Sequence, residues 1–389
     1  MPVGTLKNHL YRAALPLFGK RTPWKSVHCS HNNCGAVQPL HRLLKRHHVV
    51  GTAIQIIRGG VLAECYTAGN ARLSPAPVPV QPDTLFRTAS VAKLAAALLV
   101  FRLQTLTLLD VNEPVSDALG YPVCHPRYPN LPITLGMLLS HSSSIVDSAA
   151  YFSAFDQGTP LKTLLNDPGA FSGNKPGTNF QYSNLAAGMI GCFLEARFQL
   201  SFEALAQKYL FSPLGIGTTF DLSTLSAACV ADSYRVLPPG QSPAFDASRR
   251  TQSAISLAEP NPETHYLLAS GNLFITAQGM GRLLLPCMPS DYADSFLDQR
   301  SLVQMKTSLG QWPQQAVPMH HGMGLLKIDD PSVSSHTLYG HQGFAYGAVN
   351  GCFFTENGDG FASLNSGASE ARLGHISLLN RDLIRLFLS

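Results

Sequence analysis

The chain has 389 residues, of which 45% are hydrophobic and only 13% are charged, with a formal net charge of +4 at pH 7. This length allows one large domain or two closely packed ones with a sizeable buried core. No apolar run approaches the length of a membrane span, because the best candidate, residues 94–101, is far too short. These properties exclude a membrane-spanning helix and predict a soluble protein.

The first part of the chain is basic. Nine of the 28 Lys and Arg residues precede Glu64, which is the first acidic residue. Such an arm can touch an anionic membrane surface or nucleic acid, or it can be an ordinary solvated face that docks on a more acidic body. No nucleic-acid motif or glycine-rich phosphate loop is present, so we expect no nucleic-acid partner. Residues 1–35 are interpreted as a basic N-terminal extension, and the absence of a signal-peptide pattern predicts a cytoplasmic location.

Eight cysteines are scattered along the chain, several of them inside apolar runs such as MIGCFLEAR and NGCFF. Without a secretory signal they are expected to be free thiols in a reducing compartment. The tightest group, HCSHNNC at 28–34, contains residue types that bind zinc, but no second ligand pair at a familiar spacing accompanies it. The sequence therefore predicts no metal and no cofactor.

Both ends of the chain carry strand signals, and the middle is mostly helical. GTAIQIIRGG and VLAECYTAGNA read as a hairpin around a Gly-Gly turn, and a proline-rich connector, LSPAPVPVQPD, follows. Residues 216–264 are expected to be rich in loops. Strand-like runs near the C-terminus are GMGLLKI, TLYGHQG, YGAVNGCFFT and GFASLNS. Helices are expected at 36–48, 91–109, 133–140, 160–166, 184–197, 202–210, 276–286, 299–307 and 370–388.

This order of elements predicts an α+β fold. One antiparallel sheet would be built from both chain ends and covered by terminal helices, with a helical subdomain inserted. Residues 36–84 and 265–389 would form the α/β sheet subdomain, and residues 85–264 the inserted, mainly helical subdomain. The boundary between two such halves is a natural cleft for a ligand.

A stretch near the start of the helical part, LFRTASVAKLAAALLVF, contains Ser90 and, three residues later, Lys93. Side chains at this spacing share one face of a helix, so the lysine amine can reach the serine hydroxyl. A nucleophilic serine needs such a base, and a helix N-terminus favours developing negative charge. The alternative is an ordinary Ala- and Leu-rich helix in which Ser90 is the N-cap and Lys93 reaches the surface past its apolar stem.

A second stretch, KPGTNFQYSNLAAGMIGCFLEAR, places Tyr182 and Asn184 between a Pro-Gly turn and a helix, where side chains point into a cleft. Near an ammonium such as that of Lys93, the ionised form of a phenol is favoured, and it can then act as a general base. The alternative is a tyrosine that hydrogen-bonds its neighbours at a helix start.

A third stretch, YGHQGFAYGAVNG, has glycines on either side of His341 and Gln342 in a predicted strand. This pattern indicates a backbone that lets a ligand approach closely. The strand edge offers the N–H of Phe344, which with the N–H of Ser90 would form the two-donor oxyanion hole that acyl transfer requires. The alternative is a histidine with a purely structural role.

Taken together, Ser-x-x-Lys at 90–93, Tyr-x-Asn at 182–184 and His-x-Gly at 341–343 resemble the active-site motifs of the serine β-lactamase and penicillin-binding-protein superfamily. The branch they resemble contains class C β-lactamases, D-Ala-D-Ala carboxypeptidases, D-aminopeptidases and β-lactamase-like esterases. ITLGMLLSHSSSI, FSPLGIGTTF and ASGNLFITAQGMGRLL are also similar to this branch. The resemblance extends from residue 36 to residue 389 and leaves out the first 35 residues.

The resemblance implies a β-lactamase/transpeptidase-like fold and an acyl-enzyme formed by attack of Ser90 on a carbonyl carbon. Lys93 and Tyr182 would move the proton of the serine, and the sequence leaves open which of them is the base. Asn184 would hydrogen-bond the amide or ester side of the substrate, and His341 would position a carboxylate or the leaving group. The substrate-binding residues implied in this way are Asn184, His341, Gln342 and Gly343.

The sequence departs from the branch at three positions. β-Lactamases of the branch usually have a lysine where His341 stands, and a histidine is mostly neutral at pH 7, so efficient β-lactam hydrolysis is not expected. Ser144 and Asn272 each replace a glycine. The expected activity is that of a serine hydrolase on a D-amino-acid peptide or amide, or on a small ester.

Three alternatives share the same motifs: an acyltransferase with an alcohol or amine acceptor, a β-lactamase, and a non-catalytic penicillin-binding sensor. The expected partner is a small-molecule or short-peptide substrate. The sequence leaves the oligomeric state open.

Overall fold

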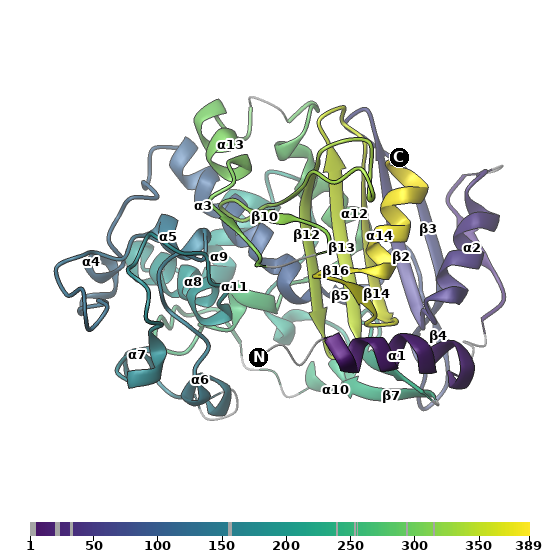
Figure 1. The fold of residues 1–389 in the computed structure, drawn as a ribbon, viewed down its shortest axis with the longest axis horizontal. Coiled ribbons are helices and arrows are strands. Elements are labelled where there is room, and N and C mark those ends of the chain that lie inside the picture. The colour runs from purple at the N-terminus through teal and green to yellow at the C-terminus, as the bar shows by residue number, and fades with distance from the viewer. Residues whose placement is uncertain are drawn as a thin grey trace.

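A central antiparallel sheet with helices on both faces dominates the computed structural model, and a mostly helical region adjoins one edge of the sheet (Figure 1). The structure describes residues 5–19, 24–31, 34–154, 158–238, 240–252, 254, 256–292, 295–313 and 316–389. No helix in these ranges is both long and apolar enough to cross a bilayer.

The main sheet is built from both chain ends, as the sequence predicts, and all its pairings are antiparallel. N-terminal strands form one side, C-terminal strands form the other, and the two groups meet where β2 pairs with β14. The strand order is β1 (Val27–Cys29), β3 (Val61–Arg72), β2 (Gly51–Arg58), β14 (Gly360–Gly367), β13 (Ala348–Thr355), β12 (Leu338–Ala345), β11 (Leu326–Ile328), β10 (Met319–His321) and β9 (Gly310–Gln311), with β4 (Val78–Pro79) paired to β3.

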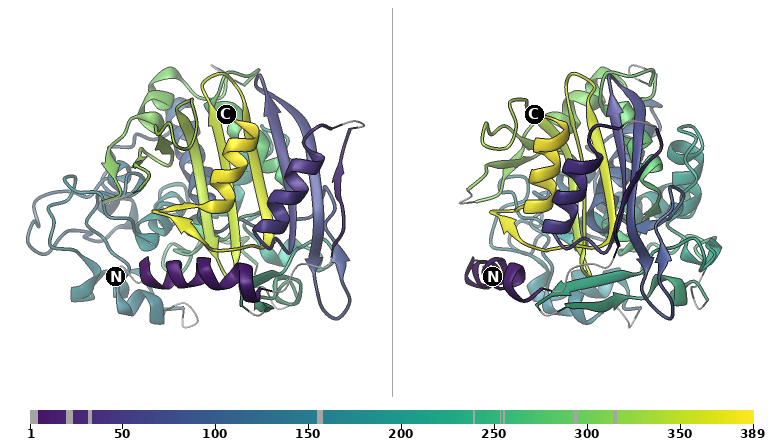
Figure 2. Two further views of the ribbon diagram at one scale, coloured as in Figure 1. Left: turned by 45° about the vertical axis from the view of Figure 1, so that its right-hand side comes forward. Right: turned by 90° about the vertical axis from the view of Figure 1, so that its right-hand side faces the viewer.

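Alternating side chains along the strands divide the core into two layers. On one face, Phe353 of β13 and Phe361 of β14 pack under α2 (Val37–Arg46) and α14 (Leu378–Phe387), which lie side by side (Figure 2). On the other face, Phe354 and neighbouring side chains join the core of the helical region and of α12 (Ala277–Leu284). The sheet is therefore covered on both faces, which explains its nearly continuous apolar strands.

The helical region surrounds α3 (Ala92–Thr105) and α8 (Asn184–Phe198). Both helices are apolar on nearly every side, which is typical of helices at the centre of a core. Shorter helices cover them: α4 (Val115–Leu119), α5 (Leu135–Leu139), α6 (Ala149–Ser153), α7 (Leu161–Leu165), α9 (Phe202–Ala206), α11 (Leu268–Gly271) and α13 (Gln299–Lys306). The structure thus confirms the predicted helices of this region, several of them shorter than expected.

Two predicted segments differ. The last helix begins at Leu378 rather than at residue 370, because Ser377 caps it by accepting the Asn380 N–H and the preceding residues form the small strands β15 (Arg372–Leu373) and β16 (Ile376–Ser377). The loop-rich segment 216–264 contains a hairpin, β6 (Ser233–Leu237) and β7 (Gly240–Phe245), followed by the short helix α10 (Ala247–Arg250).

The N-terminal extension contains structure that sequence analysis missed. Helix α1 (Thr5–Phe18) crosses one end of the sheet and packs on the β6–β7 hairpin (Figure 2). In addition, Cys29 and Cys34 form a disulfide, which corrects the expectation of free thiols throughout. The pairing of β1 with β3 and the turn into α2 bring these two cysteines together, while the other six are free.

Candidate active site

Ser90 lies at the N-terminal end of α3, within a 3₁₀ turn formed by Ala89–Val91. Ala89 has a φ of 52°, a left-handed conformation that is costly for any residue except glycine. This strained turn leads from strand β5 (Phe86–Arg87) into α3. The structure confirms that the three-residue spacing brings the two side chains together, because Lys93 Nζ is 3.2 Å from Ser90 Oγ.

The amine of Lys93 has three polar neighbours. Besides the serine hydroxyl, it contacts Asn184 Oδ1 at 2.9 Å and the carbonyl oxygen of Ser270 at 2.6 Å. Burial lowers the pKa of Lys93 to about 7, an effect that nearby Arg87 strengthens and the charge of Asp147 partly opposes. A neutral amine has two hydrogens and one lone pair, and the two carbonyl oxygens can only accept. The lone pair is then directed at Ser90, as a general base requires.

Tyr182 faces the same serine, but in the opposite protonation state to the expected one. Burial raises the pKa of its phenol, and a hydrogen bond with Ser90 opposes this effect only in part. The expectation of an ionised phenol beside the Lys93 ammonium is therefore corrected, because desolvation is the largest effect on the pKa of this phenol. Tyr182 is a hydrogen-bond donor at the nucleophile.

Strand β12 supplies the second half of the predicted oxyanion hole. Ala345 and Ala348 close a two-residue hairpin, so the next pair, Phe344 and Val349, is a non-hydrogen-bonded pair. The N–H of Phe344 consequently points away from β13. The strand approaches the nucleophile closely, since a Cβ added at Gly343 would lie 2.9 Å from the backbone nitrogen of Ser90. Only glycine allows this approach.

Asn184 is held by a residue that sequence analysis did not single out, Asp147. Its carboxylate accepts hydrogen bonds from Asn184 Nδ2 at 2.8 Å, from Ser183 Oγ at 3.0 Å and from the N–H of Leu185 at 2.9 Å. The amide of Asn184 is thereby oriented with its oxygen towards Lys93. One N–H of Asn184 remains for a substrate, so the predicted substrate-binding role is compatible with this arrangement.

His341 presents an acceptor to the site rather than a positive charge. Its Nδ1 donates to the carbonyl oxygen of Gln342 at 2.8 Å, so the buried Nε2 carries a lone pair, and Nε2 has no hydrogen-bond partner among the described residues. His321 is arranged in the same way, with Nδ1 2.6 Å from the carbonyl oxygen of Gly322. Burial lowers the pKa of both imidazoles, that of His321 to about 4. A neutral imidazole gives a carboxylate no permanent positive charge, and the role of His341 in positioning a carboxylate or the leaving group stays a prediction.

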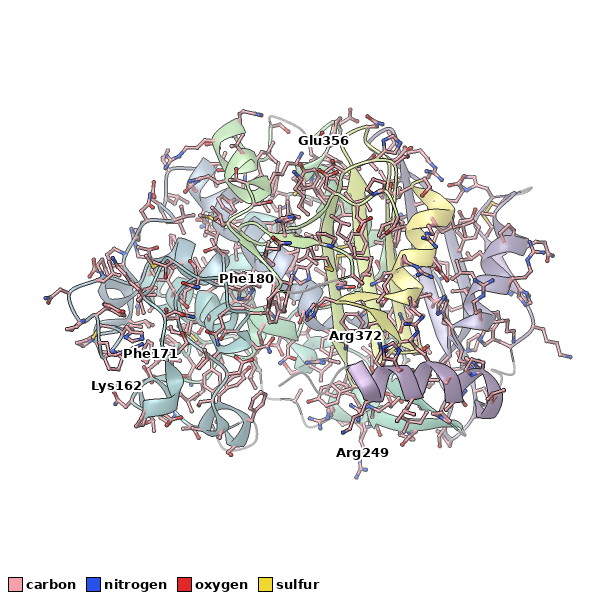
Figure 3. The ribbon with its side chains drawn as sticks, in the orientation of Figure 1. Lys162, Phe171, Phe180, Arg249, Glu356 and Arg372 are labelled. Atoms are coloured by element: carbon pink, nitrogen blue, oxygen red, sulfur yellow. A yellow bond between two sulfur atoms is a disulfide. The ribbon has the colours of Figure 1, made fainter. Side chains whose placement is uncertain are left out.

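Aromatic rings lie next to Ser90 and Lys93 on the side of Tyr182. His141 stacks on Tyr182 with ring centroids 4.4 Å apart, and Trp312 lies 5.0 Å from Tyr182 and 4.5 Å from His375. Figure 3 shows Phe180, which contacts Trp312 at 5.1 Å, near the middle of the molecule. His141 lies in the quoted stretch ITLGMLLSHSSSI and His321 in MHHGM, so both were visible in the sequence but without a signal that joined them to Ser90.

Gln342 points away from Ser90, which corrects its predicted role in substrate binding. Side chains alternate along a strand, so the neighbour of His341 points to the opposite face. There its Nε2 donates to the carbonyl oxygen of His375 at 2.7 Å, and its Oε1 accepts from Asn380 of α14 at 3.3 Å. Gln342 is therefore a structural link between β12 and the covering helix.

Ser144 and Asn272 stand where the branch has glycine, and the structure accommodates them in different ways. Ser144 has a φ of 66°, a conformation that suits glycine, and its hydroxyl donates to the carbonyl oxygen of Asn174 at 2.8 Å. Asn272 has an ordinary φ, and its side-chain oxygen accepts from Arg87 at 2.8 Å. This hydrogen bond holds the partly buried guanidinium of Arg87 next to the turn that carries Ser90.

A protein-family model described as Beta-lactamase matches residues 38–381, which is most of the chain. The chain belongs to the beta-lactamase family. Its sheet built from both chain ends and the helical region beside it are the fold of this family.

Curated relatives of this beta-lactamase-family chain include penicillin-binding protein 4 of Amycolatopsis lactamdurans, 28% identical over 46% of this chain and 47% of the relative. Esterase EstB of Burkholderia gladioli is 28% identical over 44% of this chain and 47% of the relative. The D-alanyl-D-alanine-carboxypeptidase/endopeptidase AmpH of Escherichia coli (strain K12) is 25% identical over 54% and 51%. The chain thus spans about half the length of the curated relatives it matches.

Solved structures with the same fold cover more of the chain. EstCE1, described as a hydrolase with promiscuous acyltransferase activity, has a TM-score of 0.72 at 19% identity, over 89% of this chain and 97% of that protein. The D-amino acid amidase from Ochrobactrum anthropi SV3, complexed with D-phenylalanine, has a TM-score of 0.65 at 21% identity, over 87% and 93%. At these identities the likeness concerns the fold alone.

Proposed function

We propose that this beta-lactamase-family protein is a serine hydrolase that forms an acyl-enzyme on Ser90 with a small ester or a D-amino-acid amide. The observation that carries the proposal is the environment of Lys93. Burial lowers the pKa of Lys93 to about 7, and in the neutral amine two N–H groups on carbonyl oxygens leave the lone pair directed at the serine hydroxyl.

The proposed reaction follows from the placement of the donors and acceptors. Lys93 takes the proton of Ser90 Oγ while Oγ bonds to the substrate carbonyl carbon, and the N–H groups of Ser90 and Phe344 stabilise the resulting oxyanion. The carbonyl then re-forms as the bond to the leaving group breaks, and the leaving group takes a proton from the phenol of Tyr182, which Lys93 restores. Water attacks the acyl-enzyme by the reverse sequence and releases the acid and the free serine.

The substrate class is inferred from the groups around the nucleophile. His341 and His321 offer neutral acceptors, so neither provides the permanent positive charge that the carboxylate of a β-lactam or of a peptide C-terminus would use. The rings of Tyr182, Trp312 and Phe180 suit an apolar acyl or leaving group. The names of two similar proteins, esterase EstB and the D-amino acid amidase, support an ester or a D-amino-acid amide as the substrate.

Intact-protein mass spectrometry after brief exposure to p-nitrophenyl acetate, and separately to a penicillin, tests the proposal. Wild type is expected to gain one acetyl group that disappears with time, whereas Ser90→Ala gains none. The penicillin is expected to give little or no adduct, because neither His341 nor His321 provides a permanent positive charge for its carboxylate. Equal labelling of both proteins, or no ester adduct together with no p-nitrophenol release, would contradict the proposal.

Asp147 offers a separate test of how the site is positioned. The Asp147→Asn variant is expected to lose about 10- to 100-fold in kcat/KM for the ester, because Asn184 is no longer held with its oxygen towards Lys93. The charge of Asp147 raises the pKa of Lys93, so its removal should also move the rising limb of the pH–rate profile to lower pH.

The matched control is Asp167→Asn, since among the described residues the Asp167 side chain accepts only a local N–H, from Gly169 at 3.1 Å. It should leave both rate and pH profile unchanged. An Asp147→Asn profile with an unshifted limb would show that Asp147 acts only on folding and not on Lys93.

A further inference from the structure

Helix α1 has two different faces. The inner face, at spacings of three and four, holds Asn8, Tyr11 and Leu15: Tyr11 donates to the carbonyl oxygen of Val236 at 2.8 Å, and Leu15 is buried. The outer face carries Lys7, Leu10 and Leu17, all exposed. These contacts fix which side of the helix faces away from the protein.

The outer face is unusually apolar for an exposed helix. Leu10 is 62% exposed, and Leu17, at 76%, is the most exposed large hydrophobic side chain in the described part of the chain. The two leucines are seven residues apart, which is two helical turns, so they project from the same side. Exposure of two leucine side chains to water is unfavourable. An apolar layer against this side of the helix would cover them.

Basic side chains flank this apolar stripe, and the acidic residues next to it are Asp246, at the start of α10, and Glu370, which is paired with Arg235. Lys7 and Arg12 are exposed on α1 itself, and no acidic residue occurs in the chain before Glu64. Arg249 and Arg250 of α10 are exposed as well, and Figure 3 shows Arg249 pointing outward beyond α1 on the same side of the molecule. Leucines flanked by Lys and Arg on one face are the pattern of a helix that lies in the interface of an anionic bilayer.

We infer that the face formed by α1 and α10 docks on an anionic lipid bilayer, with Leu10 and Leu17 inserted below the headgroups and the basic side chains on lipid phosphates. This surface is separate from Ser90 and its partners. Asn8 of α1 brackets the backbone of Arg372 with hydrogen bonds of 2.9 and 3.1 Å, which holds α1 on the body of the protein.

Vesicle flotation tests this inference without any use of the hydrolytic activity. The full chain is mixed with vesicles of phosphatidylcholine alone or with equal parts of phosphatidylglycerol. Wild type is expected to float with the anionic vesicles, to bind neutral vesicles about tenfold less, and to be released by high salt. The Leu10→Asp/Leu17→Asp variant is expected to lose about tenfold or more of its binding to anionic vesicles.

The matched control is Val303→Asp, since Val303 is also exposed, at 53%, but lies on α13 at the opposite end of the molecule in Figure 1. It should bind as wild type does. Thermal melting checks that the variants stay folded, which is expected because all three side chains are exposed. Equal flotation of wild type and the leucine variant, or no flotation of wild type, would overturn the inference, as would a dimer that the leucine variant abolishes while vesicles bind neither protein.

Discussion

Lys93→Met is expected to lower kcat/KM for p-nitrophenyl acetate by about 10²- to 10⁴-fold, the usual contribution of a positioned general base. Methionine keeps the length and the apolar stem of the side chain but has no lone pair of comparable basicity for Ser90. The two carbonyl oxygens that contact Nζ in the wild type lose a donor as well. Initial rates of ester hydrolysis across a pH series measure the effect.

The pH series distinguishes a base from a structural lysine. Only the uncharged amine can take a proton, so wild-type kcat/KM should rise with pH through about 7 and level off above it, because burial lowers the pKa of Lys93 to about that value. In Lys93→Met this limb should be absent. Lys162→Met, at an exposed lysine far from the site, should keep both the rate and the limb. A limb near pH 7 that persists in Lys93→Met would assign the titration to another group.

Gly343→Ala is expected to lower kcat by about 10²- to 10³-fold, the cost of losing one oxyanion donor. A methyl group at this position would lie 2.5 Å from the carbonyl oxygen of Thr88 and 2.9 Å from the backbone nitrogen of Ser90. Both neighbours are backbone atoms, so β12 must move away from the nucleophile turn and carry the N–H of Phe344 with it. KM should change much less than kcat, since the oxyanion forms only during the reaction.

Gly217→Ala is the matched control for this change, because a Cβ there meets no atom within 4 Å. It should retain wild-type kcat and melting temperature. If Gly343→Ala hydrolysed the ester at the wild-type rate while remaining folded, the strand edge of β12 could not form part of the oxyanion hole.

Local patterns were sufficient for the parts of this protein that depend on near neighbours in the chain. Ser90 and Lys93 meet because a three-residue spacing at the start of a helix places both side chains on one face. The apolar runs at both chain ends predicted a sheet assembled from both. The misplacement of Gln342 was avoidable, since the two-residue period of a strand already assigns it to the face opposite His341.

Other properties of the site depend on burial and on contacts between distant segments, which only the tertiary structure shows. The protonation states of Lys93 and Tyr182 follow from desolvation, which no local pattern measures, and desolvation reversed the expectation for the phenol. The hydrogen bond between Asp147 and Asn184 joins a loop to the first residue of α8, 37 residues later in the chain. The Cys29–Cys34 disulfide depends on the pairing of β1 with β3, and the exposure of the α1 leucines depends on which side of this helix the fold covers. Local spacing alone predicted the candidate site residues, whereas their environments, their orientation and the face that α1 leaves exposed follow from contacts between distant segments of the fold.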